Sequence, residues 1–201
     1  MRYTTNDITA VIIAGGQGKR LGGRNKGLLQ LNHQTFVALL LKKLAKQSRT
    51  QIISANNDLE DYQQYGVPVI KDITDNYQGP LSGIISCKDF INTPLVLTIP
   101  CDSPLIPDNL SQRLLDAYNS ETNTTLCVVD DGSQLQNLFM LFDAALLDDM
   151  TEYFQSGQRK VYGWIKQHSF KAVDFSDCPN SFINVNDENS LQSILNMVNT
   201  Q

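Results

Sequence analysis

Short apolar runs recur along the first half of this chain, and glycine or polar residues follow each run within three positions. Their length and their content of β-branched residues are typical of strands that are buried on both faces of a sheet. The runs that we predict as strands span residues 10–14, 51–55, 67–70 and 95–99. Apolar residues at helical spacing predict helices at residues 34–47, 59–65 and 81–90. This alternation predicts an α/β fold in which helices cover both faces of a mostly parallel central sheet.

The second half of the chain continues the pattern with less regular spacing. Predicted strands span residues 125–130, 138–142 and 171–175, and predicted helices span residues 107–118, 144–154, 161–167 and 187–198. The chain has 201 residues and carries no repeat, low-complexity tract or linker. One hydrophobic core forms readily at this length. We therefore expect a single domain over residues 1–201.

The residues that follow the four strands of the first half are candidates for ligand contact. Ligands of parallel α/β sheets bind outside the carboxyl ends of the strands, so we expect these residues to lie along one edge of the sheet. They are Gly15, Asn56, Asp72 and Asp102. The oxygens of Asn56 and Asp72 can accept hydrogen bonds from N–H groups of a ligand, and turn formation explains both residues equally well.

Asp102 lies in the sequence PCDSP at residues 100–104, where two prolines stiffen the turn after a buried strand. Magnesium binds in proteins through one or two carboxylates, with water and substrate phosphates as its other ligands. A carboxylate at this place is therefore a candidate magnesium ligand. A turn-forming or helix-capping aspartate is the alternative.

A glycine-rich loop with four cationic residues follows the first strand. Its glycines are Gly15, Gly16, Gly18, Gly22, Gly23 and Gly27, and its cations are Lys19, Arg20, Arg24 and Lys26. Exposed amides and cations after a buried strand favour phosphate binding, and a solvated surface loop is the alternative. The spacing matches neither the G-x-x-x-x-G-K-[ST] phosphate loop nor the G-x-G-x-x-G dinucleotide pattern.

Composition narrows the class of partner. The formal net charge is −5 and the pI is about 4.9, which argues against a general nucleic-acid-binding protein. We expect no membrane contact and a cytoplasmic location, because no apolar run approaches the ~20 residues of a membrane span and no signal-like segment is seen. The four cysteines form no C-x-x-C pair, so we expect reduced thiols. We expect both histidines, His33 and His168, at the surface.

The glycine loop resembles the signature of the molybdenum cofactor guanylyltransferases, a family of nucleotidyltransferases. The resemblance rests on IAGG at residues 13–16, RLGG at 20–23 and KGL at 26–28, and PCDSP at 100–104 extends it. It implies a Rossmann-like three-layer α/β/α nucleotidyltransferase fold. It also implies that GMP passes from GTP to the phosphate of molybdopterin, giving the guanine dinucleotide form of the cofactor and pyrophosphate, with Mg²⁺ as cofactor.

The resemblance also implies roles for individual residues. Catalytic roles fall on Lys26, Asp102 and Arg20, and Asp102 would hold the metal. Nucleotide contacts fall on Ile13, Ala14, Gly15, Gly16, Lys26, Asn56, Asp72 and Asp102. Acceptor-side positions are Gly79, Pro80, Ser82, Gly83, Asn184 and Asn186. The implied partners are GTP and molybdopterin, with transient contacts to cofactor-delivery proteins or molybdoenzymes.

Two departures from the family pattern are visible. Asn25 stands where the family usually has Asp before the loop lysine, and Gln136-Asn137 stand where relatives often have His-Pro, in a region expected to face the acceptor. Three alternatives stay open: a cytidylyltransferase, a sugar-phosphate nucleotidyltransferase, and a non-catalytic protein that binds GTP or molybdopterin. Gly15-Gly16 favours guanylyl transfer, because the cytidylyl relatives tend to have Ala-Gly there.

Overall fold

The fold is a seven-stranded sheet with helices on both faces, seen in a computed structural model that describes residues 2–16, 25–72, 78–120 and 123–199. The strands, in their order across the sheet, are β5 (Val69–Ile70), β4 (Thr50–Ser54), β1 (Ile8–Ile13), β6 (Leu95–Pro100), β8 (Leu135–Asp143), β7 (Leu126–Asp130) and β9 (Phe170–Asp174). Strand β1 pairs in parallel with both β4 and β6, whereas β8 is antiparallel to its two neighbours. The predicted α/β fold with a mostly parallel sheet is confirmed.

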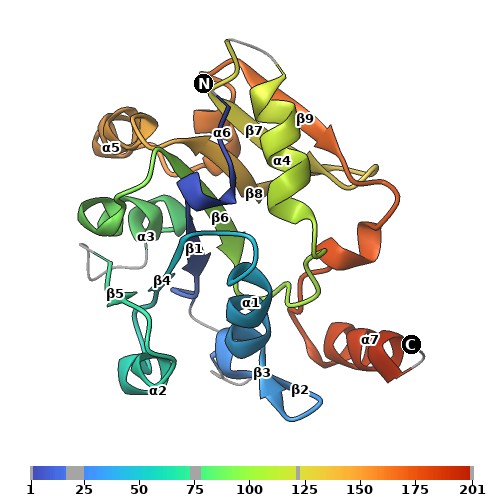
Figure 1. Cartoon of the computed structure of the whole chain (residues 1–201). Coiled ribbons are helices and arrows are strands. Elements are labelled where there is room, and N and C mark those ends of the chain that lie inside the picture. The colour runs from blue at the N-terminus through green and yellow to red at the C-terminus, as the bar shows by residue number, and fades with distance from the viewer. Residues whose placement is uncertain (1, 17–24, 73–77, 121–122, 200–201) are drawn as a thin grey trace.

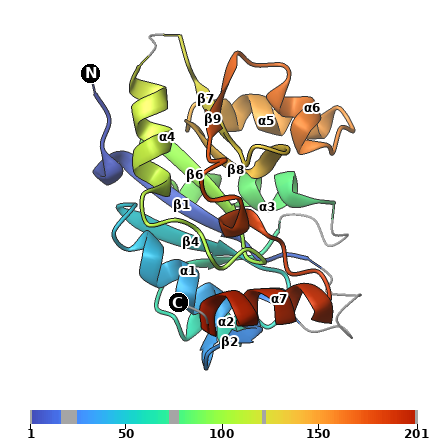
Figure 2. The same ribbon diagram turned by 90° about the vertical axis from the view of Figure 1, so that its right-hand side faces the viewer.

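Helices form the two outer layers (Figures 1 and 2). One face carries α1 (Phe36–Leu44) and α4 (Leu110–Asn119), and the other carries α3 (Pro80–Ser86), α5 (Leu146–Gln155) and α6 (Val161–Ile165). The short helix α2 (Leu59–Gln63) follows β4, and α7 (Glu188–Asn199) packs against the start of α1. Single 3₁₀ turns are η1 (Thr5–Asp7), η3 (Lys26–Leu28), η4 (Lys88–Phe90) and η5 (Pro179–Phe182).

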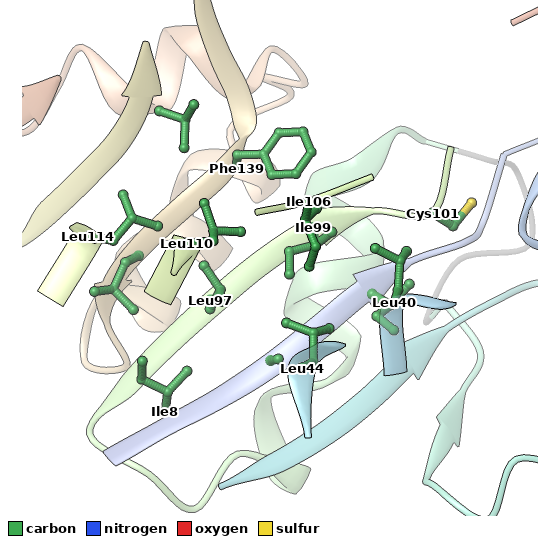
Figure 3. Packing of buried hydrophobic residues seen from close by; sticks show 14 of the residues in the cluster. Ile8, Leu40, Leu44, Leu97, Ile99, Cys101, Ile106, Leu110, Leu114 and Phe139 are labelled. Carbon is green, nitrogen blue, oxygen red and sulfur yellow. The ribbon is translucent and has the colours of Figure 1, made fainter. Parts of the chain in front are cut away.

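Strand β1 is buried because helices cover both faces of the sheet. Its successive side chains point alternately to the two faces. Ala10 and Ile12 belong to the cluster beneath α1 and α4, and Val11 belongs to the cluster beneath α3, α5 and α6. Figure 3 shows the first cluster, where Leu40 and Leu44 pack beside Ile99. This packing fixes the carboxyl ends of β1 and β6, from which the candidate site is built.

Some element boundaries differ from the predicted ones for local reasons. The helix predicted from residue 34 begins at Phe36, because the two preceding residues form β3 (Gln34–Thr35), which pairs with β2 (Gln30–Leu31). The strand predicted at residues 67–70 is shorter in the structure, where β5 begins at Val69, since Pro68 has no amide hydrogen to donate.

Three further boundaries also moved. The helix predicted at residues 107–118 begins at Leu110, the one at 81–90 ends at Ser86 and is followed by η4, and the strand at 138–142 extends over 135–143. Polar residues lie at the ends of these three elements, so the hydrophobic pattern does not mark where each element begins or ends.

The prediction that both histidines lie at the surface was wrong for one of them. His33 is exposed, but the His168 side chain is only 14% exposed. Its Nε2 lies 2.9 Å from Asp149 Oδ1, and its ring packs edge-on against Trp164. The four cysteines are free thiols, as predicted. Within the described ranges, no helix is long and apolar enough to cross a membrane.

Candidate functional site

A cavity of about 780 Å³ opens at the carboxyl ends of β1 and β6. Its wall includes residues 13–16, 25–26, 100–102 and 134–139, together with Asn184 and Asn186. The four residues expected along one edge of the sheet lie there together. Gly15, Asp72 and Asp102 line the cavity, and Asn56 lies behind Gly15 and Asp72.

Lys26 is held at the base of this cavity by two partners from distant parts of the chain. Its Nζ donates to Asp102 Oδ2 at 2.9 Å and to Asn186 Oδ1. The side chains of Lys26 and Asp102 are 21% and 18% exposed. Since charge-assisted bonds are the stronger class of hydrogen bond, this pair fixes a cation and a carboxylate side by side at the cavity wall.

The second carboxylate oxygen of Asp102, Oδ1, has no hydrogen-bond donor among the described residues. This oxygen is also buried. A buried carboxylate oxygen without a donor is costly, so it calls for a cation or a donor from a ligand. No cluster of three or more metal-ligating side chains occurs among the described residues. A single carboxylate fits a cation such as Mg²⁺ that takes its other ligands from phosphates and water.

Asp72 lies buried and contacts two polar neighbours, Asn56 and Ser54. Its Oδ2 accepts from Asn56 Nδ2 at 2.9 Å, its Oδ1 lies 3.4 Å from Ser54 Oγ, and its amide donates to Asn56 Oδ1 at 3.0 Å. Asn56 thus uses both ends of its amide group on Asp72. The arrangement orients the Asp72 carboxylate at the cavity wall, with Asn56 as its support.

Glycines at two positions bring backbone close to this pair. A Cβ on Gly15 would lie 3.1 Å from Asn56 Nδ2, and a Cβ on Gly83 would lie 2.5 Å from Ser54 Oγ and 3.2 Å from Asp72 Oδ1. Gly83 was expected on the acceptor side, but it packs directly against Asp72. The lack of a Cβ therefore lets α3 approach the ends of β4 and β5.

The start of α3 forms a separate part of the wall. Gly79 has φ +95°, in the region that favours glycine, and Pro80 occupies the first turn of the helix. Both line the cavity, whereas Ser82 is buried within α3. Arg159 holds the preceding residue, because its Nε and one terminal nitrogen donate to Gln78 Oε1 at 3.0 and 2.6 Å. Arg159 belongs to no motif, so the sequence alone gives no signal for this contact.

Residues 134–139, at the start of β8, form another part of the wall, and Gln136 and Asn137 there depart from the family pattern. Asp131 organises this segment by accepting from Ser133, from the amide of Gln134 and from Gln136 Nε2 at 2.6 Å. Burial alone raises the pKa of Asp131, but these hydrogen bonds outweigh burial and lower the pKa to about 2. Asn137 Oδ1 is buried without a hydrogen-bond partner among the described residues.

The late segment that contains Asn184 and Asn186 runs beside the turn after β6. Val185 N donates to Asp102 O at 2.8 Å, and Ser103 Oγ donates to Asn184 Oδ1 at 2.7 Å. The position of this segment explains how Asn186, 160 positions after Lys26 in the sequence, contacts the lysine. The structure brings both asparagines to the cavity, and it places Asn186 against the lysine.

Cys101 also lines the cavity, although it carries no reactive character. Burial and the neighbouring Asp102 raise the pKa of this thiol well above its ordinary value, so it stays protonated at neutral pH. The site therefore has a lysine and carboxylates but no activated thiol. Arg20, predicted as catalytic, lies outside the described residues, as does most of the glycine loop.

Comparisons with known proteins identify the family and the fold. The profile of the MobA-like NTP transferase domain matches residues 10–173. The molybdenum cofactor guanylyltransferase of Shewanella loihica is 36% identical over 93% of this chain and 95% of its own length. That of Ralstonia nicotianae is 40% identical over 90% and 93%. The solved molybdopterin-guanine dinucleotide biosynthesis protein A from Archaeoglobus fulgidus has the same fold, with a TM-score of 0.79 at 14% identity over 96% of this chain and 100% of that one.

Proposed function

Because the chain belongs to the MobA-like NTP transferase family, we propose that it transfers GMP from GTP to the phosphate of molybdopterin, with pyrophosphate as the second product. The product is then the guanine dinucleotide form of the molybdenum cofactor. The observation that carries the proposal is the Lys26–Asp102 pair at the ends of β1 and β6, in a chain similar to named guanylyltransferases over more than nine-tenths of its length.

In this mechanism a terminal phosphate oxygen of molybdopterin attacks the α-phosphorus of GTP in line, and the bond to pyrophosphate breaks. The protein contributes positioning and charge neutralisation rather than a covalent intermediate. Lys26 contacts the triphosphate, and residues 13–16 lie along it. The family resemblance assigns the same role to Arg20, which is outside the described residues. Asp102 would hold Mg²⁺, which when bound supplies positive charge to the phosphate oxygens.

The base is proposed to lie towards Asp72. The Asp72 carboxylate accepts from the ring N–H and amino group of guanine, and Asn56 keeps that carboxylate oriented through its two hydrogen bonds. Acceptor contacts then fall to other residues that line the cavity, namely Gly79, Pro80, Asn184 and Gln136-Asn137. Ser82 supports the wall from within α3, and Gly83 lies on the nucleotide side beside Asp72.

We expect GTP to bind at least tenfold better than CTP or ATP, which corresponds to roughly 1.4 kcal/mol or more. The physical reason is that the Asp72 carboxylate accepts from guanine donors that cytosine and adenine do not present in the same geometry. Calorimetric titration with the four NTPs in the presence of Mg²⁺ measures the preference. Equal affinities, or a preference for CTP, would move the assignment to the cytidylyl or sugar-phosphate branch.

Activity separates an enzyme from a binding protein. The protein is incubated with each NTP, Mg²⁺ and molybdopterin, and pyrophosphate is measured with each component omitted in turn. We expect release that requires GTP and molybdopterin together. GTP binding without pyrophosphate release would instead support a non-catalytic carrier. Contacts with cofactor-delivery proteins or molybdoenzymes, and a cytoplasmic location, stay predictions.

A further inference from the structure

The turn that carries Lys26 is tied to α2 by a single side chain, Asn25. Asn25 Oδ1 accepts from Tyr62 OH at 2.6 Å and from Gly27 N at 3.3 Å, and its Nδ2 donates to Asp58 Oδ2 at 3.2 Å. The side-chain amide of Asn25 thus contacts both Asp58, which precedes α2, and Tyr62 within α2. It also accepts from the backbone amide of Gly27 and so closes the η3 turn, in which Lys26 lies between Asn25 and Gly27.

Tyr62 makes this contact specific. Its side chain is fully buried, and burial raises the pKa of its hydroxyl far above the ordinary value. The hydroxyl is therefore a permanent donor, and Asn25 is the acceptor that the structure gives it. A Cβ on Gly27 would clash with the same hydroxyl, so the backbone of the turn lies directly on Tyr62. The lysine turn and α2 are in close contact as well as hydrogen-bonded.

A second tyrosine of the same segment extends the contact. Tyr65 OH lies 2.6 Å from Thr35 Oγ1, and Thr35 caps the start of α1. The polypeptide between Asn25 and Thr35 is therefore held to the α2 segment at both ends. Because α2 begins at Leu59, three positions after Asn56, the same short helix is close in sequence to the residue that supports Asp72.

We infer that Asn25 is a positioning residue for Lys26: through Tyr62 and Asp58 it holds the lysine turn against α2, and so sets how well the triphosphate is bound. Lys26 Nζ is a flexible point charge, and its position depends on where its backbone is fixed. Asn25 acts on the phosphates only through Lys26. The inference rests on the proposed binding of GTP at Lys26.

The two arms of the contact are tested separately. Tyr62→Phe removes the buried donor and keeps the ring. Asn25→Asp keeps the acceptor for Tyr62 and Gly27 but turns the Asp58 arm into two facing carboxylates. The double variant Asn25→Asp/Asp58→Asn exchanges donor and acceptor and restores that arm. Asn109→Asp is the matched control, because it adds the same charge at an exposed position far from the cavity.

Displacement of a fluorescent GTP analogue by GTP and by guanosine, with Mg²⁺ present, is the measurement. We expect Tyr62→Phe and Asn25→Asp to weaken GTP about three- to tenfold and to leave guanosine within about twofold, since guanosine has no phosphate for Lys26. The exchanged double variant should bind GTP within about twofold of the original protein, like the control. In a Lys26→Ala background, Asn25→Asp should have no further effect on GTP, as expected for residues that act as a unit.

Two outcomes would overturn the inference. Unchanged GTP binding in both single variants would do so, and so would an equal loss for GTP and guanosine, which would indicate a general loosening of the nucleotide site. Failure of the proposed function looks different. In that case the original protein does not bind GTP, or Lys26→Ala leaves its affinity unchanged.

Discussion

At the scale of single residues, the two carboxylate oxygens of Asp102 have different environments. One oxygen accepts from Lys26, and the other is buried with no donor from the described chain. An aspartate that capped a turn would accept a hydrogen bond from a backbone amide, and neither oxygen of Asp102 has such a bond within the described residues. The unpartnered oxygen of this cavity-lining residue therefore favours a ligand-binding role over a structural one.

The substitution Asp102→Asn separates these two roles, because it keeps the size of the side chain and removes its charge. We expect pyrophosphate release to fall at least about 100-fold, the scale seen when one preorganised electrostatic contact is lost. The melting temperature should stay within a few degrees of the original, since Lys26 keeps Asn186 as a partner. Steady-state turnover and thermal unfolding are measured together.

The control for this change is Asp89→Asn, at an exposed position outside the cavity. It should keep full turnover. Unchanged magnesium-dependent turnover in folded Asp102→Asn would contradict the metal assignment and leave Asp102 as a partner for Lys26 alone.

Sequence position was enough to bring some of these residues together, and not others. Asp102 and Asp72 were found because each follows an apolar strand whose end the parallel topology fixes. The contact between Asn25 and Tyr62 could not be found this way, since it joins a turn to a helix face 37 positions later. Tyr62 reads in the sequence as an ordinary apolar position, and only its neighbours in the fold give its hydroxyl a role.

At the scale of elements, α3 contacts the end of β4 at Gly83, where the helix has no side chain. A Cβ at this position would lie 2.5 Å from Ser54 Oγ and 3.2 Å from Asp72 Oδ1. Either the helix moves outward or both polar side chains turn away. Overpacking of this kind typically destabilises a protein by about 1–3 kcal/mol.

We therefore expect Gly83→Ala to lower the free energy of unfolding by about 1–3 kcal/mol and to weaken GTP binding by displacing Asp72. Adding Ser54→Ala removes the nearer contact, and it should recover part of the stability. Denaturant unfolding and calorimetric titration measure the two effects. Full stability in Gly83→Ala would show that α3 shifts freely, and would remove the link between this glycine and Asp72.

The segment before β8 gives a prediction about pH. The pKa of Asp131 is lowered from 3.8 to about 2, so its hydrogen bonds contribute stability above about pH 4 and lose it as the pH falls towards 2. The total contribution is roughly 2 kcal/mol. We expect Asp131→Asn to be less stable at neutral pH and to show a smaller loss of stability between pH 4 and pH 2. Urea unfolding across this range measures it, and an unchanged acid slope would contradict the contribution of Asp131.

Element boundaries were predicted less well than element types, and for a physical reason. The hairpin of β2 and β3 has only two residues in each strand, so it shows no periodicity, and its turn depends on positive φ at Asn32 and His33. The antiparallel strand β8 pairs with both β6 and β7, and this pairing extends it beyond its apolar run. In both cases the partner strands determine the limits.

At the scale of the whole molecule, the cavity lies where two parts of the sheet meet. The parallel strands β5, β4, β1 and β6 are followed by Asp72, Asn56, Gly15 and Asp102. The antiparallel strand β8 contributes Gln136 and Asn137. The segment before α7 then joins the C-terminal region to Lys26 through Asn186. A ligand that contacts all these walls holds together regions that are distant in sequence.

Such a ligand should stabilise the whole fold. A molecule that binds only the folded state, at 100 times its dissociation constant, adds about 2.7 kcal/mol to the free energy of unfolding. In a chain of this length that corresponds to an increase of about 5–10 °C in melting temperature. We expect GTP with Mg²⁺ to produce this increase, and the same concentration of CTP to produce a much smaller one. Chelation of Mg²⁺ should reduce the GTP effect in the original protein but change little in Asp102→Asn. If the increase with GTP were the same in Asp102→Asn and equally sensitive to chelation, the metal would be held elsewhere than at Asp102.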